Sequence, residues 1–199
     1  MKLRWWVIII LLSVSVYYAW QDYPINPGPG VLAPNDPQQT TISLMSIAEK
    51  DGYSIIPLAS FNIKARVLHT KHYRFDQESS LSSVDFALGW GKMSDGEILK
   101  YFKFSQSDRF YFWSTSYFPI PRNEVESHSA NMHIIASNAE IEKQLKKIKP
   151  GHIICIQGYL VEVHGSEGWL WKSSLSRTDT GKGACEVVWV KSLKVEEKR

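Results

Sequence analysis

The chain has 199 residues, of which 44% are hydrophobic and 22% charged, and these ordinary globular values exclude a wholly disordered chain. A net charge of +3 is too small for a strongly basic face, so no nucleic-acid partner is expected. Once an N-terminal anchor and a linker are set aside, roughly 160 residues remain, which suits a single domain.

Residues 5–20 read WWVIIILLSVSVYYAW, an uncharged stretch with aromatic residues at both ends. As a helix it would span about 24 Å, somewhat less than the roughly 30 Å hydrocarbon core, and its end aromatics suit the headgroup regions. Lys2 and Arg4 precede it, which favours a cytoplasmic N-terminus. We therefore expect residues 1–22 to be a single-pass anchor in the lipid bilayer of an inner membrane, with the following domain periplasmic or extracellular. A cleaved signal peptide is the alternative, and it exports the domain as well.

Residues 23–41 contain five of the nine prolines. Proline fixes φ and lacks an N–H donor, so this segment is expected to form neither a helix nor a central strand. We predict an extended, semi-rigid linker. It either holds the domain away from the membrane or packs along the domain surface.

Residues 42–199 are predicted to form one exported, β-rich globular domain. Alternating or β-rich apolar patterns predict strands at 53–58, 61–68, 109–113, 132–136, 152–163, 168–172 and 185–190. Capping boxes that begin at Ser94 and Ser137 predict two short helices. This order indicates an α+β, mostly β fold. A small OB-like barrel, with the second helix closing one end, is the first prediction, and a two-sheet sandwich is the second.

Two histidines lie in the segment SHSANMH, at 127–133. A metal site would need His128 and His133 to converge, with Asp85 or Asp179 as a third ligand. A separation of five residues places the two rings on opposite faces of a strand, so we favour structural histidines and expect no metal or other cofactor. Asn131 and His133 do share a strand face, which suits a hydrogen-bonded pair.

The segment SSLSRTDTGKGACE, at 173–186, is the most polar stretch of the chain. A hydrolase would take Cys185 or a serine as nucleophile, His128 or His133 as base, and Asp179 to orient the base. The segment has neither a GxSxG elbow nor a Walker A frame, so a loop between two strands is favoured over catalysis. For a binding surface, the candidate residues are Trp90, Asn131, His133, Arg177 and Asp179.

Cys155 and Cys185 are the only cysteines of the chain. In an oxidising compartment they would form one disulfide, which stabilises the domain by about 3 kcal/mol in the loop-entropy model. Both also lie among apolar residues, so two free buried thiols are the alternative, and the sequence leaves the choice open.

The stretches ALGWGKMSD, HSANMH and SSLSRTDTGKGACE together resemble a group of uncharacterised bacterial proteins with an N-terminal membrane anchor. The resemblance implies a bacterial envelope location and no particular activity. Because an anchor, a linker and an aromatic-rich domain are present without a catalytic signature, we expect a non-enzymatic envelope module that binds a protein partner or assembles in a membrane complex. The alternatives are a membrane-tethered hydrolase or metal enzyme, and an OB-like domain that binds a ligand or single-stranded nucleic acid.

Overall fold

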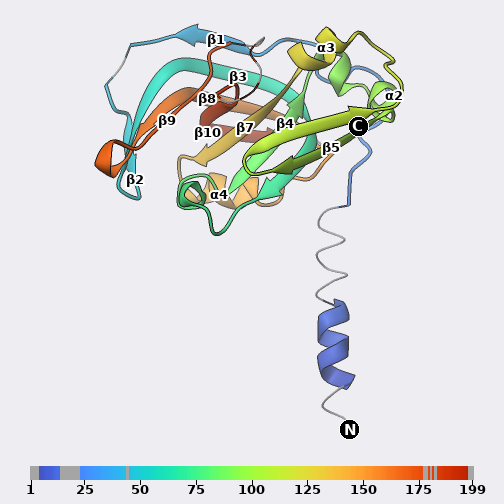
Figure 1. Ribbon diagram of the computed structural model, residues 1–199, viewed down its shortest axis with the longest axis horizontal. Helices are drawn as coiled ribbons and strands as arrows, with labels where there is room; N and C mark the ends of the chain where they lie inside the picture. The colour runs from blue at the N-terminus through green and yellow to red at the C-terminus, as the bar shows by residue number, and fades with distance from the viewer. Residues whose placement is uncertain are drawn as a thin grey trace.

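The computed structural model describes residues 5–13, 23–43, 45–176, 179, 181 and 183–196. They form an α+β fold that is mostly β, as predicted (Figure 1). Residues 5–13 are helical, whereas the rest of the predicted anchor, 1–4 and 14–22, lies outside the described residues. No helix in the described ranges combines the length and the apolar character needed to cross a bilayer. The anchor stays a prediction.

One large sheet dominates the described part of the chain. Its strands are β1 (Gln38–Thr41), β2 (Ala48–Lys50), β3 (Tyr53–His72), β4 (Val84–Gly89), β7 (Ser129–Ala136), β8 (Ile153–His164), β9 (Leu170–Lys172) and β10 (Glu186–Val195). A separate hairpin contains β5 (Phe102–Ser107) and β6 (Phe110–Thr115). The helices are α2 (Gly96–Leu99), α3 (Arg122–Ser127) and α4 (Ala139–Leu145), with 3-10 turns η1 (Gln77–Ser80), η2 (Gly91–Ser94) and η3 (Ser166–Gly168).

The two strands expected at 53–58 and 61–68 are one long strand, β3. Its first part pairs with β8 and its last part with β4, and the pairing register shifts once within each part. β4 then pairs with β7, β7 runs parallel to β10, and β10 pairs with β8. The succession of pairings therefore leads from β3 through four other strands and back to β3.

The largest core cluster lies between these strands and α4. Phe61, Ile63 and their alternate neighbours on β3 are buried, as the period of two predicted. The second predicted helix contributes Ile141 and Leu145 to the same cluster. Its N-cap is Asn138, whose side chain accepts a hydrogen bond from the Ile141 N–H, and not Ser137 as predicted. The N-cap of the first helix likewise lies one residue later than predicted, at Asp95 and not Ser94.

The Pro-rich segment packs along the domain over the residues that the structure describes. The Ile25 N–H donates to the Pro150 carbonyl at 2.7 Å, and Ala33 is fully buried in the largest core cluster. Further on, β1 pairs with β3. A sheet strand therefore already occupies residues 38–41 of the segment predicted as a linker, and the boundary at residue 41 stays a prediction. All five prolines precede this strand, so their missing N–H groups remove no hydrogen bond from the sheet.

The β5–β6 hairpin and helices α2 and α3 form a cover over one outer face of the sheet (Figure 1). Phe102 of the hairpin, Leu68 of β3 and Ala87 of β4 are buried in one cluster beneath this cover. The hairpin residues that point the other way remain exposed, among them Phe110 and Phe112. This arrangement places an aromatic strand edge next to the start of β7 and the segment before β10.

Candidate functional site

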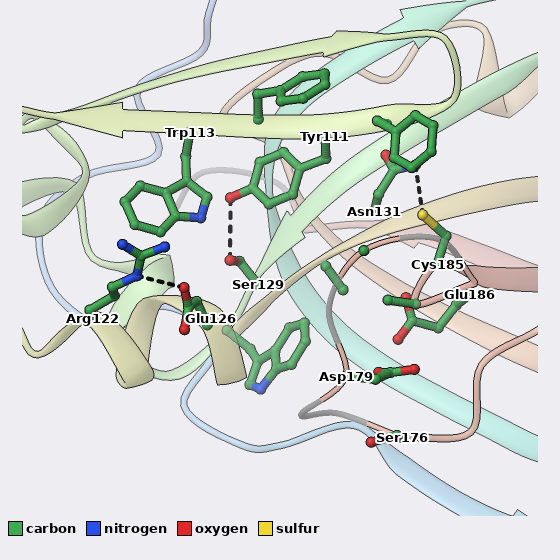
Figure 2. A pocket seen from close by; sticks show the side chains of 16 residues that line it. Tyr111, Trp113, Arg122, Glu126, Ser129, Asn131, Ser176, Asp179, Cys185 and Glu186 are labelled. Atoms are coloured by element: carbon green, nitrogen blue, oxygen red, sulfur yellow. Dashed lines mark hydrogen bonds and ion pairs between the residues drawn. The ribbon is translucent and has the colours of Figure 1, made fainter.

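A pocket of about 510 Å³ lies between β6, the start of β7, α3 and the polar segment that precedes β10 (Figure 2). The four consecutive residues 110–113 of β6 line it. Side chains alternate along a strand, so a run of consecutive lining residues means that the edge of β6, with its backbone groups, borders the cavity. The volume suits a small molecule or a short stretch of polypeptide.

Hydrogen bonds and ring contacts fix the aromatic wall of the pocket. The Tyr111 hydroxyl donates to the Ser129 Oγ at 3.2 Å, and burial raises the pKa of Tyr111. Trp113 lies under the guanidinium of Arg122, 5.5 Å from the ring centroid. Arg122 in turn forms a 2.7 Å ion pair with Glu126, one turn further along α3. Ser129 therefore holds Tyr111 on the buried side of the wall, and the Arg122–Glu126 pair holds Trp113 on the exposed side.

Cys185 and Asn131 border the pocket opposite the hairpin (Figure 2). The parallel register pairs Glu186 with Met132, so Cys185 lies across from Asn131, just before β10 begins. The Asn131 amide N–H group donates to the Arg109 carbonyl at 2.9 Å and lies 3.7 Å from the Cys185 sulfur. The sulfur is therefore bordered by the cavity and by a fixed amide.

His133 lies behind Cys185 on the same face of β7 as Asn131 and is only 3% exposed. Its Nδ1 is 2.8 Å from the Oδ2 of Asp85, a fully buried carboxylate on β4, and the parallel register makes Cys185 its diagonal neighbour on the same sheet face. Burial alone would lower the pKa of His133, but the interactions with Asp85 and Cys185 outweigh it and raise the pKa to about 9. Cys185, His133 and Asp85 thus form a chain of neighbouring side chains, of which the last two are joined by a hydrogen bond.

Arg109 anchors the far end of this chain. Its guanidinium is 2.8 Å from Asp85 and 2.7 Å from Asp76, and its Cζ lies 3.7 Å from the centroid of the Tyr73 ring. Burial opposes the charge, yet the hydrogen bonds to Asp76 and the charge of Asp85 raise the pKa of Arg109 overall. Burial next to Asp85 raises the pKa of Tyr73 to about 12. A second cavity, of about 480 Å³, opens beside Arg109 and Trp171.

The structure brings together most of the predicted binding residues. Trp90, Asn131, Asp179 and Cys185 all line the pocket, and His133 lies directly behind it. Trp90 is nonetheless a core residue, 1% exposed, with its Nε1 donating to Asp36 at 3.1 Å. Asp179 accepts a 2.6 Å hydrogen bond from Ser174. Arg177 lies outside the described residues.

Asp179 and His128, two residues considered for the hydrolase alternative, make other contacts in the structure. The residue that orients His133 is Asp85 and not Asp179, which bonds Ser174 instead. His128 caps α3: its Nδ1 lies 3.0 Å from the Glu124 carbonyl, and its ring packs near Trp90. The two histidines therefore belong to different elements, His128 to the C-cap of α3 and His133 to β7, and not to opposite faces of one strand. No three His, Cys, Asp or Glu side chains converge as metal ligands within the described ranges.

Of the two alternatives that the sequence left open for Cys155 and Cys185, the structure shows two free thiols and not a disulfide. Cys155 lies on β8 opposite Lys194, which is nine residues beyond Cys185 along β10. At about 3.3 Å per residue the two cysteines lie roughly 30 Å apart along the strand, far beyond the Cα separation of about 6 Å that a disulfide needs.

Arg109 was not predicted to be a site residue, and Asp85 was predicted only as a possible metal ligand. Both residues stand out in the sequence as charges inside apolar strand patterns, Asp85 in VDFALG and Arg109 before FYFW. A charge within a predicted buried strand requires a partner, and that rule would have drawn attention to both.

The chain has no match among protein-family models, curated proteins or solved structures.

Proposed function

We propose that this protein is a membrane-tethered envelope module that binds an extended segment of a protein partner in the pocket beside β6. The observation that carries the proposal is the cavity of about 510 Å³ along the edge of an aromatic strand. Within the described residues β6 pairs with β5 alone, which leaves its pocket-side edge available for main-chain hydrogen bonds. An extended peptide binds such an edge as an additional strand.

The side chains around the pocket indicate what that segment contains. Phe110 and Phe112 are 41% and 52% exposed, and exposed aromatic residues next to a cavity are typical of interaction surfaces. Arg122 is already paired with Glu126, whereas Asp179 contributes a carboxylate. This composition favours a partner segment with an apolar side chain and a basic one.

The tether rests on the sequence of the N-terminal segment. The side chains of residues 5–12 are all exposed, between 46% and 65%, and all are apolar. Lys2 and Arg4 place the N-terminus in the cytoplasm by the positive-inside rule. A periplasm-dependent alkaline phosphatase fused after residue 199 is expected to be active, and an inactive but intact fusion would contradict the export of the domain.

We further propose that β3, β4, β7, β10 and β8 form an OB-like barrel. One support is the succession of strand pairings that leads from β3 back to β3. The other is α4, which lies between β7 and β8 in the sequence and contributes Ile141 and Leu145 to the largest core cluster. In OB domains the ligand-binding face includes the second and third barrel strands, which here would be β4 and β7. The hairpin covers part of that face, so the pocket beside the hairpin replaces an open OB surface and disfavours single-stranded nucleic acid as the ligand.

Site-specific photocrosslinking tests the binding site. Benzoylphenylalanine in place of Phe112, in the full chain in native membranes, is expected to crosslink to a discrete polypeptide. Phe75, which is 98% exposed and does not line the pocket, is the matched control position. Ala184→Trp, which fills the pocket from its lining, is expected to abolish the crosslink. Equal crosslinking at both positions, or a crosslink unaffected by Ala184→Trp, would overturn the proposal.

A further inference from the structure

We propose that Cys185 is the nucleophile of a thiol acyl-transfer site that opens into the pocket, with His133 as its proton acceptor and Asp85 as a positioning residue. The substrate class is a carbonyl with a leaving group, that is, an amide, ester or thioester. The inference goes beyond partner binding and does not rest on it, because the reactivity of the thiol can be measured without any partner.

The first support is the order of the hydrogen bonds. Asp85 holds the Nδ1 of His133 at 2.8 Å, which leaves the other ring nitrogen free to face Cys185, its diagonal neighbour on the same face of the parallel β7–β10 pair, whose sulfur also lies 3.9 Å from the Arg109 carbonyl. Nucleophile, base and orienting carboxylate therefore follow one another as thiol catalysis requires. Each comes from a different segment, β4, β7 and the residue before β10, and the sheet pairings fix their spacing.

The second support is the division between accessible and buried groups. Cys185 borders the pocket, whereas His133 and Asp85 are 3% and 0% exposed and lie behind it. A substrate can therefore reach the sulfur while water is kept from the imidazole and its carboxylate, which strengthens their electrostatic interaction. A network that served only to join the hairpin to the sheet would not need a sulfur at the cavity wall.

The third support is charge. The Asp85 carboxylate favours the imidazolium form of His133, which places a cation behind the sulfur at the pocket wall. The groups that face His133 are Asp85 from β4, Cys185 before β10 and the ring of Trp171 from β9, with Arg109 beyond Asp85. Arg109 neutralises part of the Asp85 charge but stays bound to Asp76 as well.

The reaction balances without a cofactor. The Cys185 sulfur forms a C–S bond to the carbonyl carbon, and the tetrahedral adduct expels the leaving group, which takes the proton from the His133 imidazolium. Water then adds to the resulting thioester while the neutral imidazole accepts its proton. The second adduct expels the thiolate, releases a carboxylic acid and restores the starting pair, so the net change is hydrolysis of one acyl bond.

Alkylation by iodoacetamide, followed by mass spectrometry of the full chain in detergent micelles, tests the thiol. Cys155 is a built-in control, because its strand partners are Lys64 on β3 and Lys194 on β10, with no histidine between them, and burial raises its pKa. At pH 7, Cys185 is expected to react at least about tenfold faster than Cys155, because it borders the pocket and lies beside the protonated His133. His133→Gln and Asp85→Asn are expected to slow the alkylation of Cys185 at pH 7 while leaving that of Cys155 unchanged.

Acyl transfer is tested with 4-nitrophenyl acetate. The full chain and its Cys155→Ser variant are expected to release a burst of one nitrophenolate per protein, and Cys185→Ser is expected to release none. The wild-type comparison of the two thiols needs no variant, so a folding failure of His133→Gln does not weaken the test. The inference is overturned if Cys185 and Cys155 are alkylated at the same rate at pH 7, or if Cys185 is alkylated faster but forms no acyl adduct.

Discussion

Raising the pH from about 6 to about 10 is expected to lower the free energy of unfolding by about 3 kcal/mol, because folded His133 holds its proton far more tightly than an unfolded histidine does. Its pKa is about 9 in the fold, against an ordinary value of 6.5. Since the folded value is the higher one, the stabilisation is fully present below about pH 6.5 and is lost as the pH rises through 9. Each pKa unit corresponds to about 1.4 kcal/mol, which gives the stated magnitude.

Urea unfolding of the full chain in mild detergent, followed by tryptophan fluorescence, measures this loss. His133→Gln removes the titrating group, so its unfolding free energy should fall by about 3 kcal/mol less than that of the wild type over the same pH range. In a Cys185→Ser background the difference between the two variants should be smaller, because Cys185 contributes to the raised pKa of His133. Parallel pH dependences for wild type and His133→Gln would refute the argument, as would a stability that rises between pH 7 and 9.

Three further predictions concern the fold that holds the site. Arg109→Met is expected to destabilise the domain by about 3–5 kcal/mol, measured as a lower urea midpoint, because two carboxylates lose their cation; an unchanged midpoint would contradict this. Gly158→Ala should prevent folding or lower Tm by more than about 6 °C, since a Cβ there would lie 1.9 Å from the Trp189 carbonyl oxygen. Asn138→Ala is expected to cost about 1 kcal/mol, because the Ile141 N–H loses its capping acceptor, and Asn138→Ser should restore most of it.

Much of the fold could be predicted from local patterns. The period of two along β3 identified its buried face, and the capping boxes located α2 and α4 to within one residue. β4 was missed because all six of its residues, VDFALG, are buried, so it shows no alternation. The two predicted strands merged into β3 because a single long strand can change partners at a bulge, which no short sequence window reveals.

The site depends on pairings between strands that are distant in the chain. For that reason the Asn131–His133 pair could be predicted, whereas the positions of Cys185 and Asp85 could not. That Asn131 and His133 share a face follows from strand geometry alone. That Cys185 lies next to them requires the parallel pairing of β7 with β10, whose partners are more than fifty residues apart. That Asp85 lies behind His133 requires the antiparallel pairing of β4 with β7. Sequence patterns identify the strands but not which strands become neighbours.

The hairpin turn shows how local strain and the site are connected. β5 and β6 are joined by Asp108 and Arg109, with φ of 51° and 66°, values that a tight two-residue turn requires and that glycine or asparagine adopt most readily. A side chain such as arginine in the left-handed region costs about 1 kcal/mol. Here the same conformation directs the guanidinium towards Asp76 and Asp85, and the turn carbonyl of Arg109 accepts the hydrogen bond from Asn131. A glycine at 109 would relieve the turn but leave Asp85 without its cation, so the strain is retained because the turn holds both the hairpin and the carboxylate that orients His133.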